Sequence, residues 1–212
     1  MNRALAISAA VASALYLFLG RTLAYPGGAI IKTSMCVLLA LLAWRQRQRL
    51  LTVALLFSAA GDAILAIEGT NLFVPALGSF LITHLLYAAI FVGLYRTAPF
   101  VLAGWRKAMM ILAIVFAIGY LVVLWPNLGA LAVPVLLYVC AIVTMTAFSF
   151  RVQPIIVPAG ALLFMISDSL IAYEKFIRPA FWLSAAIWIT YAMAQQMIVY
   201  GLIRPDGRQF RK

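Results

Sequence analysis

Long apolar runs separated by short polar breaks decide what this chain can fold into. A helix that crosses a bilayer needs about 20 mostly apolar residues, and it must satisfy its backbone hydrogen bonds internally. Eight runs fit this requirement, at 4–20, 28–44, 50–67, 72–95, 108–125, 129–150, 155–173 and 178–202. We therefore predict an all-α polytopic membrane protein. It is a bundle of about eight transmembrane helices that forms a single domain over residues 1–212.

The composition excludes other classes of protein. Hydrophobic residues make up 67% of the chain and charged residues only 10%, whereas a soluble domain has about 45–50% and 25%. A water-exposed surface cannot be built from so few polar side chains. The net charge of +11 is therefore interpreted relative to a membrane, and nucleic acid is excluded as a partner.

The basic residues indicate how the chain is oriented. Twelve of the sixteen Lys and Arg residues fall on one side of the predicted bundle, together with both termini, and three fall on the other. Loops rich in Lys and Arg remain in the cytoplasm. We predict a multi-pass protein in contact with membrane lipids, with cytoplasmic N and C termini. A bacterial protein of this kind would lie in the inner (cell) membrane.

Four ionisable residues lie inside the apolar runs, namely Lys32, Asp62, His84 and Asp168. A charge in hydrocarbon costs at least about 2.5–3.5 kcal/mol, so such residues are candidates for a functional site. The predicted orientation puts all four at mid-depth or in the outer half of the membrane, and we expect them to face one cavity. Purely structural roles stay open. Lys32 can extend to the interface or form an architectural ion pair, and His84 can be a packing residue.

The two intramembrane aspartates share a local pattern. Segments 61–68 and 167–174 match at Asp62 and Asp168, and again at an alanine and at a final glutamate. The offset is 106 residues, half the chain, which fits a parallel repeat of four plus four helices. Three matches in eight residues fit coincidence equally well. The glutamates, Glu68 and Glu174, end their helices, and Asp206 belongs to the C-terminal tail.

The residue types favour acid and base chemistry. Two buried carboxyl groups beside one cation can divide the roles of proton donor and carboxylate. A zinc site is less well supported, because the chain has a single histidine and no metal-binding spacing. Cys36 and Cys140 both lie in apolar runs and are interpreted as small packing residues rather than a disulfide or metal pair.

Several ordered motifs resemble a known family. They are Lys32, Gly61-Asp62, the stretch 80–87 with His-Leu-Leu-Tyr, the stretch 160–168 with Gly-Ala-Leu-Leu-Phe and Ser-Asp, and Tyr191 to Gln195. Together they are similar to the YhhN family, which includes the lysoplasmalogenases of animal membranes. The resemblance extends from about Lys32 to Gln195.

The resemblance implies an eight-span enzyme that hydrolyses the vinyl ether bond of a lysophospholipid, without a metal or cofactor. Asp62 and Asp168 would be the catalytic residues, one acting as acid and the other as stabiliser and base. Lys32 would tune these carboxyl groups or bind the phosphate of the substrate. The remaining pocket residues would be His84, Tyr87, Tyr191 and Gln195.

Two other classes of function remain open from the residues alone. A proton-coupled transporter or channel can use the same buried carboxylates. A structural membrane protein would tolerate neutral residues at the four buried positions, although inserting those residues is costly.

Overall fold

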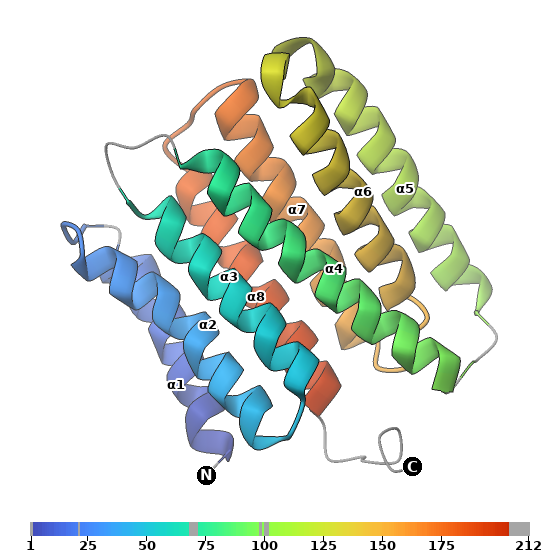
Figure 1. Cartoon of the computed structure of the whole chain (residues 1–212), viewed down its shortest axis with the longest axis horizontal. Coiled ribbons are helices and arrows are strands. Elements are labelled where there is room, and N and C mark those ends of the chain that lie inside the picture. The colour runs from blue at the N-terminus through green and yellow to red at the C-terminus, as the bar shows by residue number, and fades with distance from the viewer. Residues whose placement is uncertain (1, 21, 68–71, 98, 100–101, 204–212) are drawn as a thin grey trace. The chain divides into compact units, whose positions relative to one another are not determined.

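The computed structural model describes residues 2–20, 22–67, 72–97, 99 and 102–203. Its described part contains eight α-helices and no strand (Figure 1). The helices are α1 (Asn2–Leu15), α2 (Gly27–Arg45), α3 (Arg49–Leu65), α4 (Phe73–Thr97), α5 (Gly104–Leu124), α6 (Ala132–Ser149), α7 (Ile156–Phe176) and α8 (Leu183–Ile203). The predicted all-α architecture is confirmed. A π-helical turn, Tyr16–Gly20, extends α1.

Seven of the helical segments in the described part are long and apolar enough to cross a membrane. The exception is α3, which has 17 residues and spans about 26 Å at 1.5 Å per residue. That length is close to the lower limit for a hydrocarbon core of about 30 Å. The sequence predicts this span at 50–67, and the helix ends two residues earlier. Among the described α-helices after α1, the helix that carries Asp62 is thus the shortest.

The chain forms two compact units, residues 1–87 and 88–212. The boundary lies within α4. In the first unit α2 packs against both α1 and α3, and in the second α5 packs on α6, α6 on α7 and α7 on α8. The expectation of one domain over the whole chain stays a prediction, as do the four-plus-four repeat and the cytoplasmic termini.

A tight polar turn joins α2 to α3, as the sequence predicts. The backbone N–H of Arg47 donates to the carbonyl of Trp44, and that of Gln48 donates to the carbonyl of Ala43. Arg47 has a φ of 57°, in the left-handed region that a residue other than glycine rarely adopts. This reversal brings α2 and α3 together as antiparallel neighbours, so that residues 26 to 30 apart come into contact.

One buried arginine holds the turn between α6 and α7. The Arg106 guanidinium, at the start of α5, donates hydrogen bonds of 2.9, 2.7 and 2.9 Å to the carbonyls of Phe150, Val152 and Gln153. These carbonyls follow the end of α6, where a helix leaves acceptors without intrahelical donors. Arg106, counted among the basic residues that indicate orientation, therefore also stabilises this turn.

Two of the acidic residues discussed above, Glu68 and Asp206, lie outside the described residues. Glu174 lies in the last turn of α7, as expected.

Candidate active site

Asp62, on α3, is almost completely buried and forms an ion pair with Lys32 of α2. The Lys32 Nζ lies 3.5 Å from Asp62 Oδ1, and the two side chains are 18% and 2% exposed. An ammonium at this distance stabilises the carboxylate form of the aspartate. Lys32 therefore does not simply extend to the interface. The structure confirms the pairing that was one of the alternatives for this residue.

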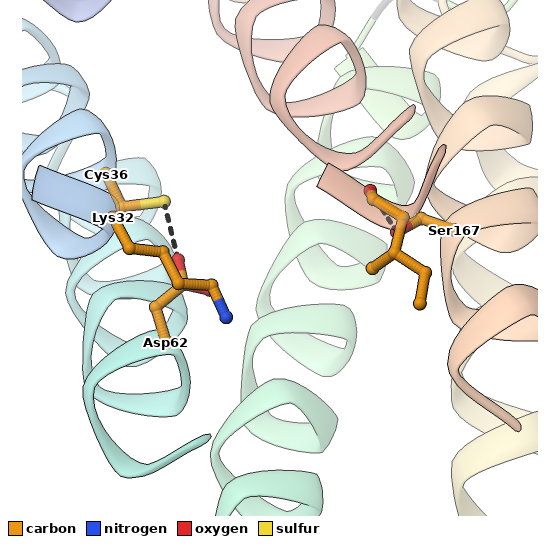
Figure 2. A network of polar contacts seen from close by, with 5 residues as sticks. Lys32, Cys36, Asp62 and Ser167 are labelled. Atoms are coloured by element: carbon orange, nitrogen blue, oxygen red, sulfur yellow. Dashed lines mark hydrogen bonds and ion pairs between the residues drawn. The ribbon is translucent and has the colours of Figure 1, made fainter. Parts of the chain in front are cut away.

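A buried thiol is a second partner of this carboxylate. Cys36 lies four residues after Lys32 and so on the same face of α2. Its Sγ is fully buried and donates to Asp62 Oδ2 over 3.7 Å. Figure 2 shows both side chains reaching Asp62 from the same helix. Cys36 is thus a polar partner of the carboxylate, which its interpretation as a packing residue missed.

Close packing between α3 and α4 fixes the backbone beside Asp62. A Cβ added at Gly61 would lie 2.7 Å from Cε2 of Phe80, so only glycine fits there without a shift. Hydroxyl hydrogen bonds join the same two helices: Ser79 Oγ donates to the Phe57 carbonyl over 2.7 Å, and Thr83 Oγ1 donates to the Ala54 carbonyl over 3.1 Å. Such bonds hold helices together where water is absent.

His84 and Tyr87 lie one turn apart on α4 and are both fully buried. The sequence predicts them as pocket residues, and the structure places them inside the first unit, on the helix that packs against the Asp62 segment of α3. Their role toward a substrate stays a prediction.

Asp168, on α7 in the second unit, is half-buried and accepts a short hydrogen bond from a tyrosine. The Tyr138 hydroxyl, on α6, donates to Asp168 Oδ2 over 2.6 Å. One residue further along α7, the Tyr120 hydroxyl of α5 donates to the carbonyl of Ser169 over 2.7 Å. Two phenols from two helices therefore hold the segment that carries this carboxyl group.

The other side of this segment is joined to α8. Ser167 Oγ donates to the carbonyl of Ile187 over 3.1 Å (Figure 2). The Tyr191 ring packs edge-on against Phe164 of α7, with ring centroids 5.4 Å apart. Gln195, one turn after Tyr191, is completely buried. The structure thus buries both predicted α8 residues in the unit that holds Asp168.

Comparison with known proteins identifies the family of this chain. The YhhN family model matches residues 28–202, a range that includes Lys32, Asp62, Asp168 and Gln195. The chain belongs to the YhhN family. The resemblance predicted from the ordered motifs is therefore confirmed over most of the chain.

Curated relatives carry an enzymatic name. A lysoplasmalogenase from Mycobacterium tuberculosis is 39% identical over 180 residues, which is 80% of this chain and 68% of the relative. Lysoplasmalogenase TMEM86A from Bos taurus is 33% identical over 162 residues, 71% of this chain and 64% of the relative. The human protein of that name is 32% identical over the same length. No solved structure matches the chain.

Sequence reasoning missed two partners of the aspartates, Cys36 and Tyr138. One signal for Tyr138 was present. It lies 30 residues before Asp168, and Lys32 lies 30 residues before Asp62. The expectation that the two aspartates face one cavity stays a prediction, because each lies in a different unit.

Proposed function

We propose that this membrane protein hydrolyses the vinyl ether bond of lysoplasmalogens. The products are a fatty aldehyde and glycerophosphoethanolamine or glycerophosphocholine. The observation that carries the proposal is the 39% identity, over 80% of the chain, to curated proteins named lysoplasmalogenase. A substrate with one hydrocarbon chain also suits a protein with seven apolar candidate spans in its described part.

The reaction requires the groups that the chain buries. Hydrolysis begins when an acid transfers a proton to the carbon β to the ether oxygen, which leaves an oxocarbenium ion. Water adds to the carbon next to the oxygen and loses a proton, and the resulting hemiacetal breaks into alcohol and aldehyde. One carboxylic acid and one carboxylate supply the donor and the stabilising base. We assign these tasks to Asp62 and Asp168.

The remaining site residues act on binding and orientation. Lys32, with its ion pair to Asp62, tunes that carboxyl group, and contact with the phosphate of the substrate is the alternative role for its ammonium. His84, Tyr87, Tyr191 and Gln195 hold the substrate through hydrogen bonds and apolar contact. All four are buried, which suits a binding site that excludes bulk water.

We place the protein in the cell membrane, with both termini in the cytoplasm. Support comes from the seven candidate spans and from the excess of Lys and Arg on the side of the termini. A reporter domain that functions only in the cytoplasm should be active when it is fused to either end of the chain. A reporter that is active outside would reverse the orientation.

Aldehyde release tests the proposal directly. Purified protein in liposomes receives a lysoplasmalogen, and a coupled alcohol dehydrogenase measures the aldehyde. Asp62→Asn and Asp168→Asn each lose most of the activity, because removing one partner of an acid and base pair typically costs about 10²–10⁴-fold. Glu174→Gln, the same chemical change near the end of α7, retains it.

The controls distinguish vinyl ether hydrolysis from the alternative function, transport. A lysophospholipid with a saturated ether chain releases no aldehyde. Normal turnover in both Asn variants would refute the catalytic assignment. Uptake driven by a pH gradient into liposomes, with no aldehyde from the wild-type protein, would instead support a transporter.

A further inference from the structure

The ion pair between Lys32 and Asp62 lies near one end of the two helices that carry it. Lys32 comes five residues after Gly27, where α2 begins, and Asp62 comes three residues before Leu65, where α3 ends. At 1.5 Å per residue, the two positions are about 8 Å and about 5 Å from these helix ends. The other end of α2 is Arg45, about 20 Å along the helix from Lys32.

The length of α2 relates these helix ends to the two membrane surfaces. The helix has 19 residues and is apolar enough to cross a membrane. Its length is about 28 Å, close to the hydrocarbon thickness of about 30 Å. We call the surface at its first residue the Lys32 surface, and the surface at the turn between α2 and α3 the turn surface. The ion pair is therefore much closer to the Lys32 surface.

The distribution of polar side chains along α2 is equally uneven. Polar residues occupy positions 32–34, and every residue from 37 to 44 is hydrophobic. Arginines follow at positions 45, 47 and 49, in and beside the turn. A charged head group that approached the ion pair from the turn surface would pass along the apolar segment of α2. From the Lys32 surface it would not.

The structure of a lysoplasmalogen requires a reactive group at the depth of this ion pair. The vinyl ether oxygen is bonded directly to the glycerol carbon, and glycerol lies at the boundary between the head groups and the hydrocarbon. A lipid in the leaflet of the Lys32 surface needs to move its vinyl ether inward by only about 5–8 Å to reach the pair. A lipid in the other leaflet would have to carry its charged phosphate most of the way across the hydrocarbon.

We propose that the protein takes its lysoplasmalogen from the leaflet of the Lys32 surface and does not act on the lipid in the leaflet of the turn surface. This inference rests on the vinyl ether hydrolysis proposed above, with Asp62 in the site. The phosphate of the substrate stays at the membrane surface while the vinyl ether reaches Asp62. With the cytoplasmic termini proposed above, the leaflet that supplies the substrate is the outer one.

Cysteine labelling identifies the two surfaces independently of activity. Thr22→Cys places a thiol in the connection before α2, where Thr22 is exposed, and Gln46→Cys places one in the turn after it, where Gln46 is partly exposed. In sealed vesicles of one orientation, a membrane-impermeant maleimide should label one of these variants and not the other, and vesicles of the opposite orientation should reverse the result. The wild-type protein is the control, because its two cysteines lie within α2 and α6. Labelling of both variants from the same side would overturn the proposal, since α2 would not cross the membrane.

Aldehyde release from the same two vesicle preparations tests the leaflet. The vesicles are washed free of ATP, lysoplasmalogen is added to the outside, and the aldehyde is extracted and measured by mass spectrometry. Vesicles with the turn surface inside should release aldehyde at once. Vesicles with the turn surface outside should release about ten- to a hundredfold less, because a single charge taken to the middle of the hydrocarbon already lowers a population by about a hundredfold. Asp62→Asn in both preparations gives the background.

Detergent distinguishes a failure of this inference from a failure of the proposed function. Once the vesicles are dissolved, both preparations should release aldehyde at the same rate per protein, because every site is open to substrate. A wild-type protein that is inactive in detergent overturns the hydrolysis, and the choice of leaflet with it. Activity in detergent with equal rates in the two intact preparations, or with the faster rate when the turn surface is outside, overturns the choice of leaflet alone.

Discussion

The ion pair between Lys32 and Asp62 gives a quantitative prediction, because one partner is far more buried than the other. The Asp62 side chain is 2% exposed and the Lys32 side chain 18%. Two unit charges 3.5 Å apart interact by about 5 kcal/mol at an effective dielectric constant of 20. Lys32→Met keeps the length of the side chain and removes its charge. It leaves a buried carboxylate, and we expect a loss of about 3–5 kcal/mol in the free energy of unfolding.

The reverse change is expected to cost less. Asp62→Asn leaves the charge of Lys32, whose side chain is 18% exposed, and we expect a loss of about 1–3 kcal/mol. The double variant contains no buried charge at this pair and should lie within about 2 kcal/mol of the wild-type protein. The coupling energy of the cycle is then at least about 2 kcal/mol, because the two single losses together exceed the loss of the double variant by at least that much.

The assay is unfolding in mixed micelles titrated with SDS and followed by circular dichroism. Lys107→Met is the matched control, because Lys107 is exposed at the start of α5, and it should change stability by less than about 0.5 kcal/mol. A Lys32→Met variant as stable as Lys107→Met, or a coupling energy under about 1 kcal/mol, would refute the buried ion pair.

Two further substitutions test the packing around the site and the clamp on the helix turn. Gly61→Ala puts a methyl group against the Phe80 ring and should destabilise the fold by about 1–3 kcal/mol in the same SDS unfolding assay. Gly78→Ala, whose Cβ would meet nothing within 4 Å, should be neutral or stabilising in that assay. Arg106→Ala removes three hydrogen bonds to carbonyls and should cost on the order of 3 kcal/mol. Lys107→Ala beside it should cost almost nothing, and equal free energies of unfolding for the two variants would contradict the clamp.

The helices could be predicted from the sequence because hydrocarbon imposes one local rule. Each apolar run must satisfy its own backbone hydrogen bonds, so its length and its polar breaks define a helix. The run predicted at 28–44 is the helix Gly27–Arg45, and the polar segment after it is the turn. The predicted span 50–67 ends at Leu65, because apolar residues after a helix do not by themselves continue it.

The contacts of the site could be predicted only where a residue type is unusual in a membrane. Lys32 and Asp62 are costly there, so they indicate a partner. Cysteine and tyrosine are common in apolar runs, so the sequence around Cys36 and Tyr138 does not distinguish a packing residue from a hydrogen-bond donor. In the sequence, Arg106 is one of the basic residues that indicate the orientation of the chain in the membrane. In the structure its guanidinium is buried and donates to backbone carbonyls. These roles depend on neighbours that only the folded helices supply.

Lys32 and Tyr138 each lie 30 residues before the aspartate that they contact. Both donate to a carboxyl group, but only the ammonium of Lys32 adds a full positive charge, so the surroundings of Asp62 and Asp168 differ. A reaction that uses one carboxyl group as acid and another as base would need such a difference between its two groups.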